Sequence, residues 1–285
     1  MPEIIDRRSF LESCVAGACV AAVAAEGVSG GQAPPAEIID CHVHLKHGDA
    51  ARTEWSAEAI VDLLDQAGIH RAIVFAMSNG TVRSIEMARE AARRFPGRLI
   101  PFLYALPSYE RPVLKDMEQA LGEGGFRGIK IHAGECTLAE YVLDPVLRLA
   151  GSFPVPCLVD CAGNAATARR LAKEFPQTPF WFAHMGRYLA TDAGLVEQFI
   201  KVAEEFENVS LDLSAVALVY KIEEAVSRLG ARRLVWGTDG PYKNPDIVTY
   251  ARAELNKIRT LNISPADKEL ILGGNVARML RLGKQ

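Results

Sequence analysis

Residues 38–45 read Ile-Ile-Asp-Cys-His-Val-His-Leu, a mainly apolar run with polar side chains at alternate positions. This alternation predicts a buried β-strand that carries Asp40, His42 and His44 on one face, opposite the apolar side chains between them. Two neutral imidazoles close together near the end of a strand can bind a divalent metal. A His-x-His pair also arises by chance, so its meaning depends on the rest of the chain.

From residue 38 onward the sequence alternates strand and helix patterns. Strands are predicted at 38–45, 70–76, 98–106, 125–132, 155–161, 180–184, 209–213 and 233–237. Amphipathic helices are predicted between them, and closing helices over the last forty or so residues. Eight short apolar strands joined by helices predict a single-domain α/β fold, the (β/α)8 or TIM barrel. An open doubly wound sheet is the alternative, but its Gly-rich dinucleotide turn is absent from the sequence.

Residues 1–36 are predicted to form a leader and linker, with the barrel over 37–285. Asp6-Arg7-Arg8-Ser9-Phe10-Leu11 resembles a twin-arginine export signal, and a weakly apolar run and a Gly-, Ser- and Pro-containing stretch follow it. The apolar run is too short to span a bilayer, so stable membrane insertion is not expected. We therefore expect a periplasmic or secreted protein, the alternative being an N-terminal tail on a cytoplasmic one.

The charge balance argues against polyanionic partners. The chain has 32 Lys and Arg against 35 Asp and Glu, and no basic run, so nucleic acid is not an expected partner. A small molecule is the expected substrate, and the sequence does not indicate an oligomeric state.

Polar residues interrupt the predicted strands at their C-terminal ends. His42 and His44 close the first strand, Lys130 and His132 the fourth and His184 the sixth, while Asp239 follows the eighth. This end of a (β/α)8 barrel carries the active site. Because four separate strands each bring polar residues to the same rim, the prediction of a metal site is stronger than the His-x-His pair alone would make it.

Five segments resemble the amidohydrolase superfamily, specifically its amidohydrolase-related (amidohydrolase 2) group of metal-dependent barrel hydrolases. Residues 39–44, 125–132, 182–186, 234–241 and 271–278 read Ile-Asp-Cys-His-Val-His, Gly-Phe-Arg-Gly-Ile-Lys-Ile-His, Phe-Ala-His-Met-Gly, Leu-Val-Trp-Gly-Thr-Asp-Gly-Pro and Ile-Leu-Gly-Gly-Asn-Val-Ala-Arg. They follow the order of the family across essentially the whole chain after the leader.

The resemblance implies a role for each matching residue. His42 and His44 would be metal ligands, Asp239 a ligand that also takes a proton from water, and His184 a ligand or a group that polarises the substrate carbonyl. A bound divalent ion lowers the pKa of water from about 16 to about 7, and a neighbouring carboxylate can accept the proton. One divalent metal is expected, zinc first and manganese as the alternative.

The sequence departs from the family pattern at the fifth strand. The family usually presents a histidine there, whereas this chain offers Asp160 or Cys161. Either side chain can bind a metal, and Asp160 is included among the candidate ligands. Lactonases of this group work without a metal, so a metal-free site is a further alternative.

The remaining candidates are expected to contact the substrate. Lys130 could be a carbamylated ligand that bridges two metals, but a substrate-contacting or structural lysine is favoured, and we include it in the catalytic set. His132 shares its face of the strand. Arg187 and Tyr188 follow the sixth strand, where they could hold a substrate carboxylate. His47 is expected at the surface without a role.

Three functions are consistent with these features. The first is hydrolysis of a small ester, lactone or amide by metal-activated water, favoured because the chain is compact. The second is non-oxidative decarboxylation or hydration of a small carboxylic acid, since the family includes such lyases. The third is a catalytically degenerate barrel that binds a ligand, which only the missing histidine of the fifth strand supports.

Overall fold

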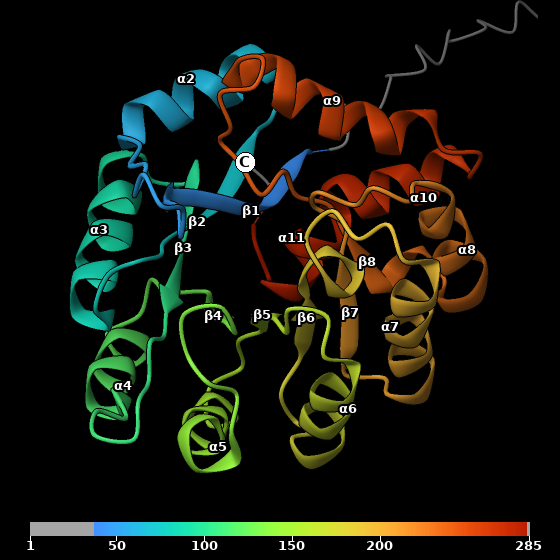
Figure 1. The fold of residues 1–285 in the computed structure, drawn as a ribbon. Helices are drawn as coiled ribbons and strands as arrows, with labels where there is room; N and C mark the ends of the chain where they lie inside the picture. The colour runs from blue at the N-terminus through green and yellow to red at the C-terminus, as the bar shows by residue number, and fades with distance from the viewer. Residues whose placement is uncertain (1–36, 284–285) are drawn as a thin grey trace, which may run out of the picture. The chain divides into compact units, whose positions relative to one another are not determined.

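Strands and helices alternate through residues 37–283, the part of the chain that the computed structural model describes (Figure 1). The strands are β1 (Ile39–Lys46), β2 (Arg71–Ala76), β3 (Leu99–Tyr104), β4 (Gly128–His132), β5 (Cys157–Asp160), β6 (Phe180–Phe182), β7 (Val209–Asp212) and β8 (Leu234–Val235). The α-helices are α2 (Ala57–Ala67), α3 (Thr81–Arg94), α4 (Leu114–Gly122), α5 (Glu140–Ala150), α6 (Ala165–Glu174), α7 (Ala193–Glu205), α8 (Tyr220–Leu229), α9 (Ile247–Thr260), α10 (Pro265–Glu269) and α11 (Asn275–Met279). Shorter helical turns are η1 (Ala183–Gly186), η2 (Ala231–Arg233) and η3 (Leu270–Gly274).

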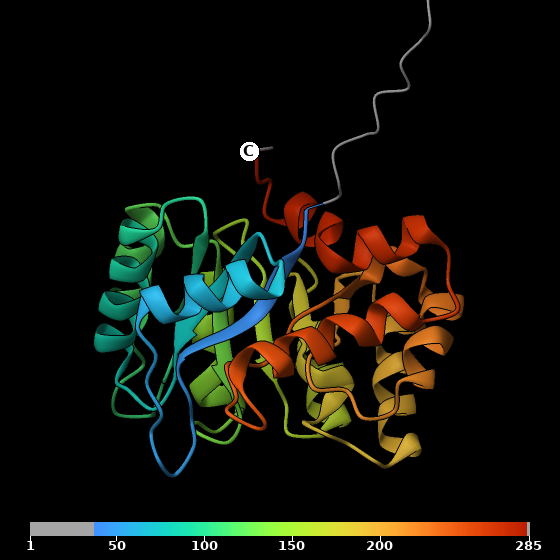
Figure 2. The same cartoon turned by 90° about the horizontal axis from the view of Figure 1, so that it is seen from above.

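The strands of the described residues form one parallel sheet in the order β1 to β8. Backbone hydrogen bonds continue from β1 to the segment after β8, from His44 N to Gly240 O at 2.8 Å and from Asp239 N to His42 O at 2.8 Å. These bonds bring the first and last strands together into a near-closed barrel, with helices around its outside (Figures 1 and 2). The predicted single-domain (β/α)8 fold is confirmed.

Two apolar layers hold the barrel together. Ile73, Phe102 and Trp181 belong to a cluster that fills the barrel interior. A larger cluster lies between the sheet and the helices, where α2 contributes Ile60 and Leu64. Apolar burial of this kind contributes about 25 cal/mol per Å² of area removed from water. The interior cluster fills the barrel below the rim, and buried polar side chains lie at the rim itself.

Helix α2 begins and ends where the sequence indicates. Ser56 caps its first turn by accepting a hydrogen bond from Ala59 N at 3.2 Å. Gly68 ends the helix in the left-handed conformation, with φ 76°. Helices α2 and α9 pack side by side, so the helix after β8 lies against the helix after β1 (Figures 1 and 2).

The simple alternation predicted for the first strand is wrong. Ile39 and Cys41 face the barrel interior, whereas Val43 packs in the outer layer between sheet and helices. A register shift between Asp40 and Val43 causes the change, because a bulge reverses the faces of the residues that follow it. Cys41 and His42 consequently both reach the same carboxylate on β7.

The leader predicted in residues 1–36 lies outside the described residues, so export and localisation stay predictions. Within residues 37–283, no helix is both long and apolar enough to cross a membrane.

Candidate active site

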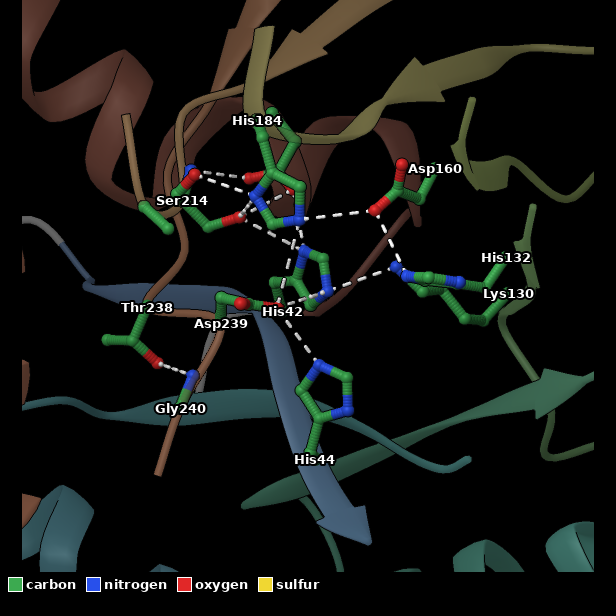
Figure 3. Close-up of polar contacts among 12 residues, drawn as sticks. His42, His44, Lys130, His132, Asp160, His184, Ser214, Thr238, Asp239 and Gly240 are labelled. Atoms are coloured by element: carbon green, nitrogen blue, oxygen red, sulfur yellow. Dashed lines mark hydrogen bonds and ion pairs between the residues drawn. The ribbon is translucent and has the colours of Figure 1, made fainter. Parts of the chain in front are cut away.

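Three buried side chains, from β1, from the turn after β6 and from the loop after β8, gather at the C-terminal rim of the barrel. The metal-binding atoms of His42, His184 and Asp239 all lie within 4.8 Å of one another (Figure 3). His42 Nε2 is 3.0 Å and His184 Nε2 3.9 Å from Asp239 Oδ1. Two imidazole nitrogens and one carboxylate oxygen are a common donor set for zinc and similar ions. The cluster therefore could hold a divalent metal.

The loop after β8 places Asp239 in this cluster. Asp40 holds the loop through Thr238, whose backbone N–H and hydroxyl donate to the Asp40 carboxylate at 2.9 and 2.7 Å. Burial raises the pKa of Asp40 to about 7, although those hydrogen bonds lower it. Gly237 lets the loop cross β1, since an added Cβ would lie 2.8 Å from the Cβ of His42. Asp40 is thus a structural residue and no member of the cluster.

Asp212 and Ser214 orient His42. Asp212 Oδ2 lies 2.6 Å from His42 Nδ1 and also accepts a hydrogen bond from the Ser214 hydroxyl at 2.8 Å. A carboxylate at this distance favours a proton on Nδ1, which leaves the Nε2 lone pair toward Asp239. Burial raises the pKa of Asp212, but its interaction and hydrogen bond with His42 lower it overall.

Neither Asp212 nor Ser214 is predicted from the sequence. Asp212 is the last residue of β7, so its position at a strand end was the available signal.

A turn rather than a strand presents His184, contrary to the prediction that it closes the sixth strand. β6 ends at Phe182, and His184 lies in η1 with a left-handed backbone, φ 59°. Its Nδ1 lies 2.8 Å from the carbonyl oxygen of Ser214, which can only accept a hydrogen bond. The proton therefore belongs on Nδ1, and Nε2 has a lone pair toward Asp239.

His44 contacts Asp239 from outside the three-residue cluster. Its Nε2 lies 3.0 Å from Asp239 Oδ1, and its buried Nδ1 has no hydrogen-bond partner among the described residues. Burial lowers its pKa well below the usual value, which favours a neutral ring. His47 stacks on His44 at 4.4 Å and is 4% exposed, so its predicted surface position is wrong.

A buried cation stands beside the cluster. Lys130 is fully buried, and its Nζ lies 3.0 Å from His42 Nε2. Burial lowers its pKa overall, although the charges of Asp160 and Asp239 oppose this shift and favour the ammonium form. Phe75 lies beneath the ammonium group, with its ring centre 5.1 Å from Nζ.

Asp160, and not Cys161, faces the site from the fifth strand. Its Oδ2 lies 3.1 Å from His132 Nε2 and 3.6 Å from His184 Nε2 (Figure 3). Asp160 therefore lies next to the cluster but is not one of the three residues whose metal-binding atoms lie within 4.8 Å of one another. Cys161 instead packs in the outer apolar layer, where burial raises the pKa of its thiol.

The two residues after η1 lie at the mouth of the site. Tyr188 is 42% exposed, and its ring lies edge-on to that of His184 at 5.6 Å. Arg187 is exposed, and within residues 37–283 no polar contact joins it to the cluster. The structure thus brings Tyr188 to the histidines but leaves Arg187 at the surface.

Solved structures share the fold at low sequence identity. 5-Carboxyvanillate decarboxylase from Sphingomonas paucimobilis has a TM-score of 0.68 at 14% identity, over 87% of this chain and 100% of the other. A probable 2-pyrone-4,6-dicarboxylic acid hydrolase from Acinetobacter baumannii, with bound citric acid, has a TM-score of 0.67 at 16% identity. The match covers 86% of this chain and 100% of the other. Dihydroxybenzoic acid decarboxylase from Polaromonas sp. JS666, with bound manganese and the inhibitor 2-nitroresorcinol, has a TM-score of 0.65 at 18% identity. The match covers 87% of this chain and 98% of the other.

Comparison with curated proteins finds no significant match. The sequence profile of the family described as Amidohydrolase matches residues 39–282, which include every residue of the cluster and nearly the whole barrel. With the fold and the rim of histidines and aspartates, this match shows that the chain belongs to the amidohydrolase family.

Proposed function

We propose that this chain is a metal-dependent enzyme that removes the carboxylate of a small organic acid by non-oxidative decarboxylation. The observation that carries the proposal is the buried cluster of His42, His184 and Asp239 with the Lys130 ammonium group 3.0 Å from His42. The similar decarboxylases, which act on aromatic acids, support this reaction class.

The ion expected in the cluster is zinc or manganese, held by His42, His184 and Asp239 with His44 beside them. When bound, such an ion supplies a Lewis acid that fixes and polarises the oxygens of an acidic substrate. The two histidines suit this role because hydrogen bonds to Asp212 and to the Ser214 carbonyl hold their Nδ1 protons away from the cluster.

Lys130 would bind the substrate carboxylate, and Asp239 would transfer the proton. The ammonium group of Lys130 offers a buried positive charge for the substrate carboxylate, a pairing that is strong away from water. Burial raises the pKa of Asp239, but its close contacts with His42 and His184 lower it well below the usual value, so it is ionised at rest. In decarboxylation Asp239 takes a proton from the substrate or solvent and delivers it to the carbon that loses carbon dioxide.

Hydrolysis of an ester or lactone is the second candidate. Asp239 is ionised at rest and so has no proton to lose before it accepts one from an attacking water, although its lowered pKa makes it a weak base. The similar probable hydrolase of a pyrone dicarboxylic acid also supports it. The compact chain is no longer an argument for hydrolysis, since the match to the Sphingomonas decarboxylase covers 100% of that chain.

Isotope labelling separates the two reactions. We would incubate the zinc- or manganese-loaded enzyme with hydroxylated benzoic acids and with lactones of dicarboxylic acids, in D2O and in H2¹⁸O. Decarboxylation puts one deuterium on the carbon that lost carbon dioxide, whereas hydrolysis puts ¹⁸O in the acid product. We expect deuterium and no ¹⁸O in the product, and the Asp239→Asn variant should incorporate no deuterium. Turnover of lactones alone, with ¹⁸O in the product, would refute decarboxylation.

A further inference from the structure

Tyr242 contacts the one oxygen of Asp239 that the histidines do not approach. The Tyr242 hydroxyl donates a hydrogen bond to Asp239 Oδ2 at 3.0 Å. His42 Nε2 and His44 Nε2 each lie 3.0 Å from the other oxygen, Oδ1. The two oxygens of the carboxylate therefore have separate partners.

Packing fixes the position of the Tyr242 ring. The ring of His47 lies 4.7 Å from it at an interplanar angle of 36°, and the ring of Tyr250 lies edge-on at 5.1 Å. These contacts belong to a closed circuit of aromatic neighbours around the site, formed by His42, His44, His47, Tyr242, Tyr188 and His184. A ring held on two sides in this way keeps its hydroxyl on Asp239.

The backbone that carries Tyr242 is also held. It follows Asp239 on the same loop, and His47 Nε2 lies 2.8 Å from the carbonyl oxygen of Pro241 between them. Asp239 itself donates its backbone N–H to His42 O at 2.8 Å. The distance from the Tyr242 hydroxyl to Asp239 is thus set by contacts on both residues.

We propose that Tyr242 is a positioning residue that restrains Asp239 Oδ2, so that Asp239 presents only Oδ1 to the point where the imidazoles converge. Asp239 would then hold a bound ion through Oδ1 alone. This inference rests on the proposed function in one respect, because it assumes that a divalent ion occupies the cluster. It requires no particular substrate or reaction.

Cobalt binding tests the inference without turnover. Co²⁺ would be titrated into metal-free wild-type protein and into the Tyr242→Phe variant, with its visible absorption recorded. Removing a partner of a metal ligand typically weakens metal binding about 10–100-fold, and we expect a loss of that size. The freed Oδ2 should also join the coordination of Co²⁺, and a higher coordination number weakens the visible absorption band.

Tyr250→Phe is the matched control. It removes the same group from a neighbouring ring, but the Tyr250 hydroxyl donates to the carbonyl oxygen of Thr238 at 2.9 Å and not to Asp239. Its Co²⁺ affinity and spectrum should equal those of the wild type. Circular dichroism would verify that both variants are folded.

Three results would overturn the inference, and they have different consequences. If Tyr242→Phe binds Co²⁺ with the affinity and spectrum of the wild type, Tyr242 does not position Asp239, and the proposed function is unaffected. Equal changes in both variants would show that the loss of a hydroxyl from this aromatic cluster, and not the bond to Asp239, matters. No Co²⁺ binding by folded wild-type protein would refute both this inference and the metal dependence in the proposed function.

Discussion

Asp212 is the residue on which the orientation of His42 depends. The Asp212→Asn substitution keeps the size of the side chain but removes the charge that holds the proton on His42 Nδ1. We expect metal affinity to fall about 10–100-fold, the usual result of changing the partner of a ligating histidine. Competition with a chromogenic chelator would measure the affinity, and a value equal to that of the wild type would contradict this role for Asp212.

At this scale the sequence predicted the residue types of the rim but not their partners. His42, His184 and Asp239 could be found because each interrupts or follows an apolar strand at the same end. Ser214 and Tyr242 could not, since each lies in a loop whose path depends on contacts with distant segments. A single sequence does not show those contacts.

Among the elements, the turn between β6 and α7 is the one that presents His184. Gly186 ends this turn with φ 121°, and an added Cβ would lie 2.3 Å from the ring of Phe199 on α7. Gly186→Ala should therefore lower the free energy of unfolding by about 2–4 kcal/mol, through backbone strain and overpacking together. Gly68→Ala is the control, because Gly68 also has positive φ but has open space around it, so only the backbone strain of about 1–2 kcal/mol is expected. If urea unfolding shows the same loss of unfolding free energy in both variants, the contact with Phe199 does not contribute.

An ion cluster joins α7 to α8 and should make stability depend on pH. Arg228 hydrogen-bonds Glu197 at 2.8 Å and Glu204 at 2.7 Å. The bonds from Arg228 and Lys221 lower the pKa of Glu197 to about 2, below its unfolded value of about 4.3. A lowered carboxyl pKa stabilises the fold above the unfolded pKa, and this stabilisation is lost as the pH falls toward 2.

The Arg228→Met variant tests this cluster. Wild type should exceed the variant in free energy of unfolding at pH 7, and the difference should shrink by pH 3. Urea titrations at both pH values would measure it, and a difference independent of pH would rule out the ionic contribution. The effect is expected to be small because these side chains are partly exposed.

For the whole molecule, the sequence predicted the architecture better than the local geometry. Eight apolar runs separated by amphipathic helices were enough to indicate the barrel, because each run can be buried only against its neighbours in a sheet. The bulge in β1 and the turn at His184 were not visible, since both arise from contacts between strands and not from local preference. Substrate choice also lies beyond the sequence, because the βα loops that shape the site are not fixed by the barrel.

The most direct test of the account is the metal content of the protein. Wild type, His184→Ala and His132→Ala would be purified without chelators, reconstituted with zinc or manganese, dialysed and analysed by elemental mass spectrometry. His132 contacts Asp160 but lies outside the cluster of His42, His184 and Asp239, so it serves as the control. We predict about one bound ion per chain in wild type and in His132→Ala, and its loss in His184→Ala. A folded wild-type protein that retains no ion, or equal metal content in all three proteins, would contradict a metal site formed by this cluster.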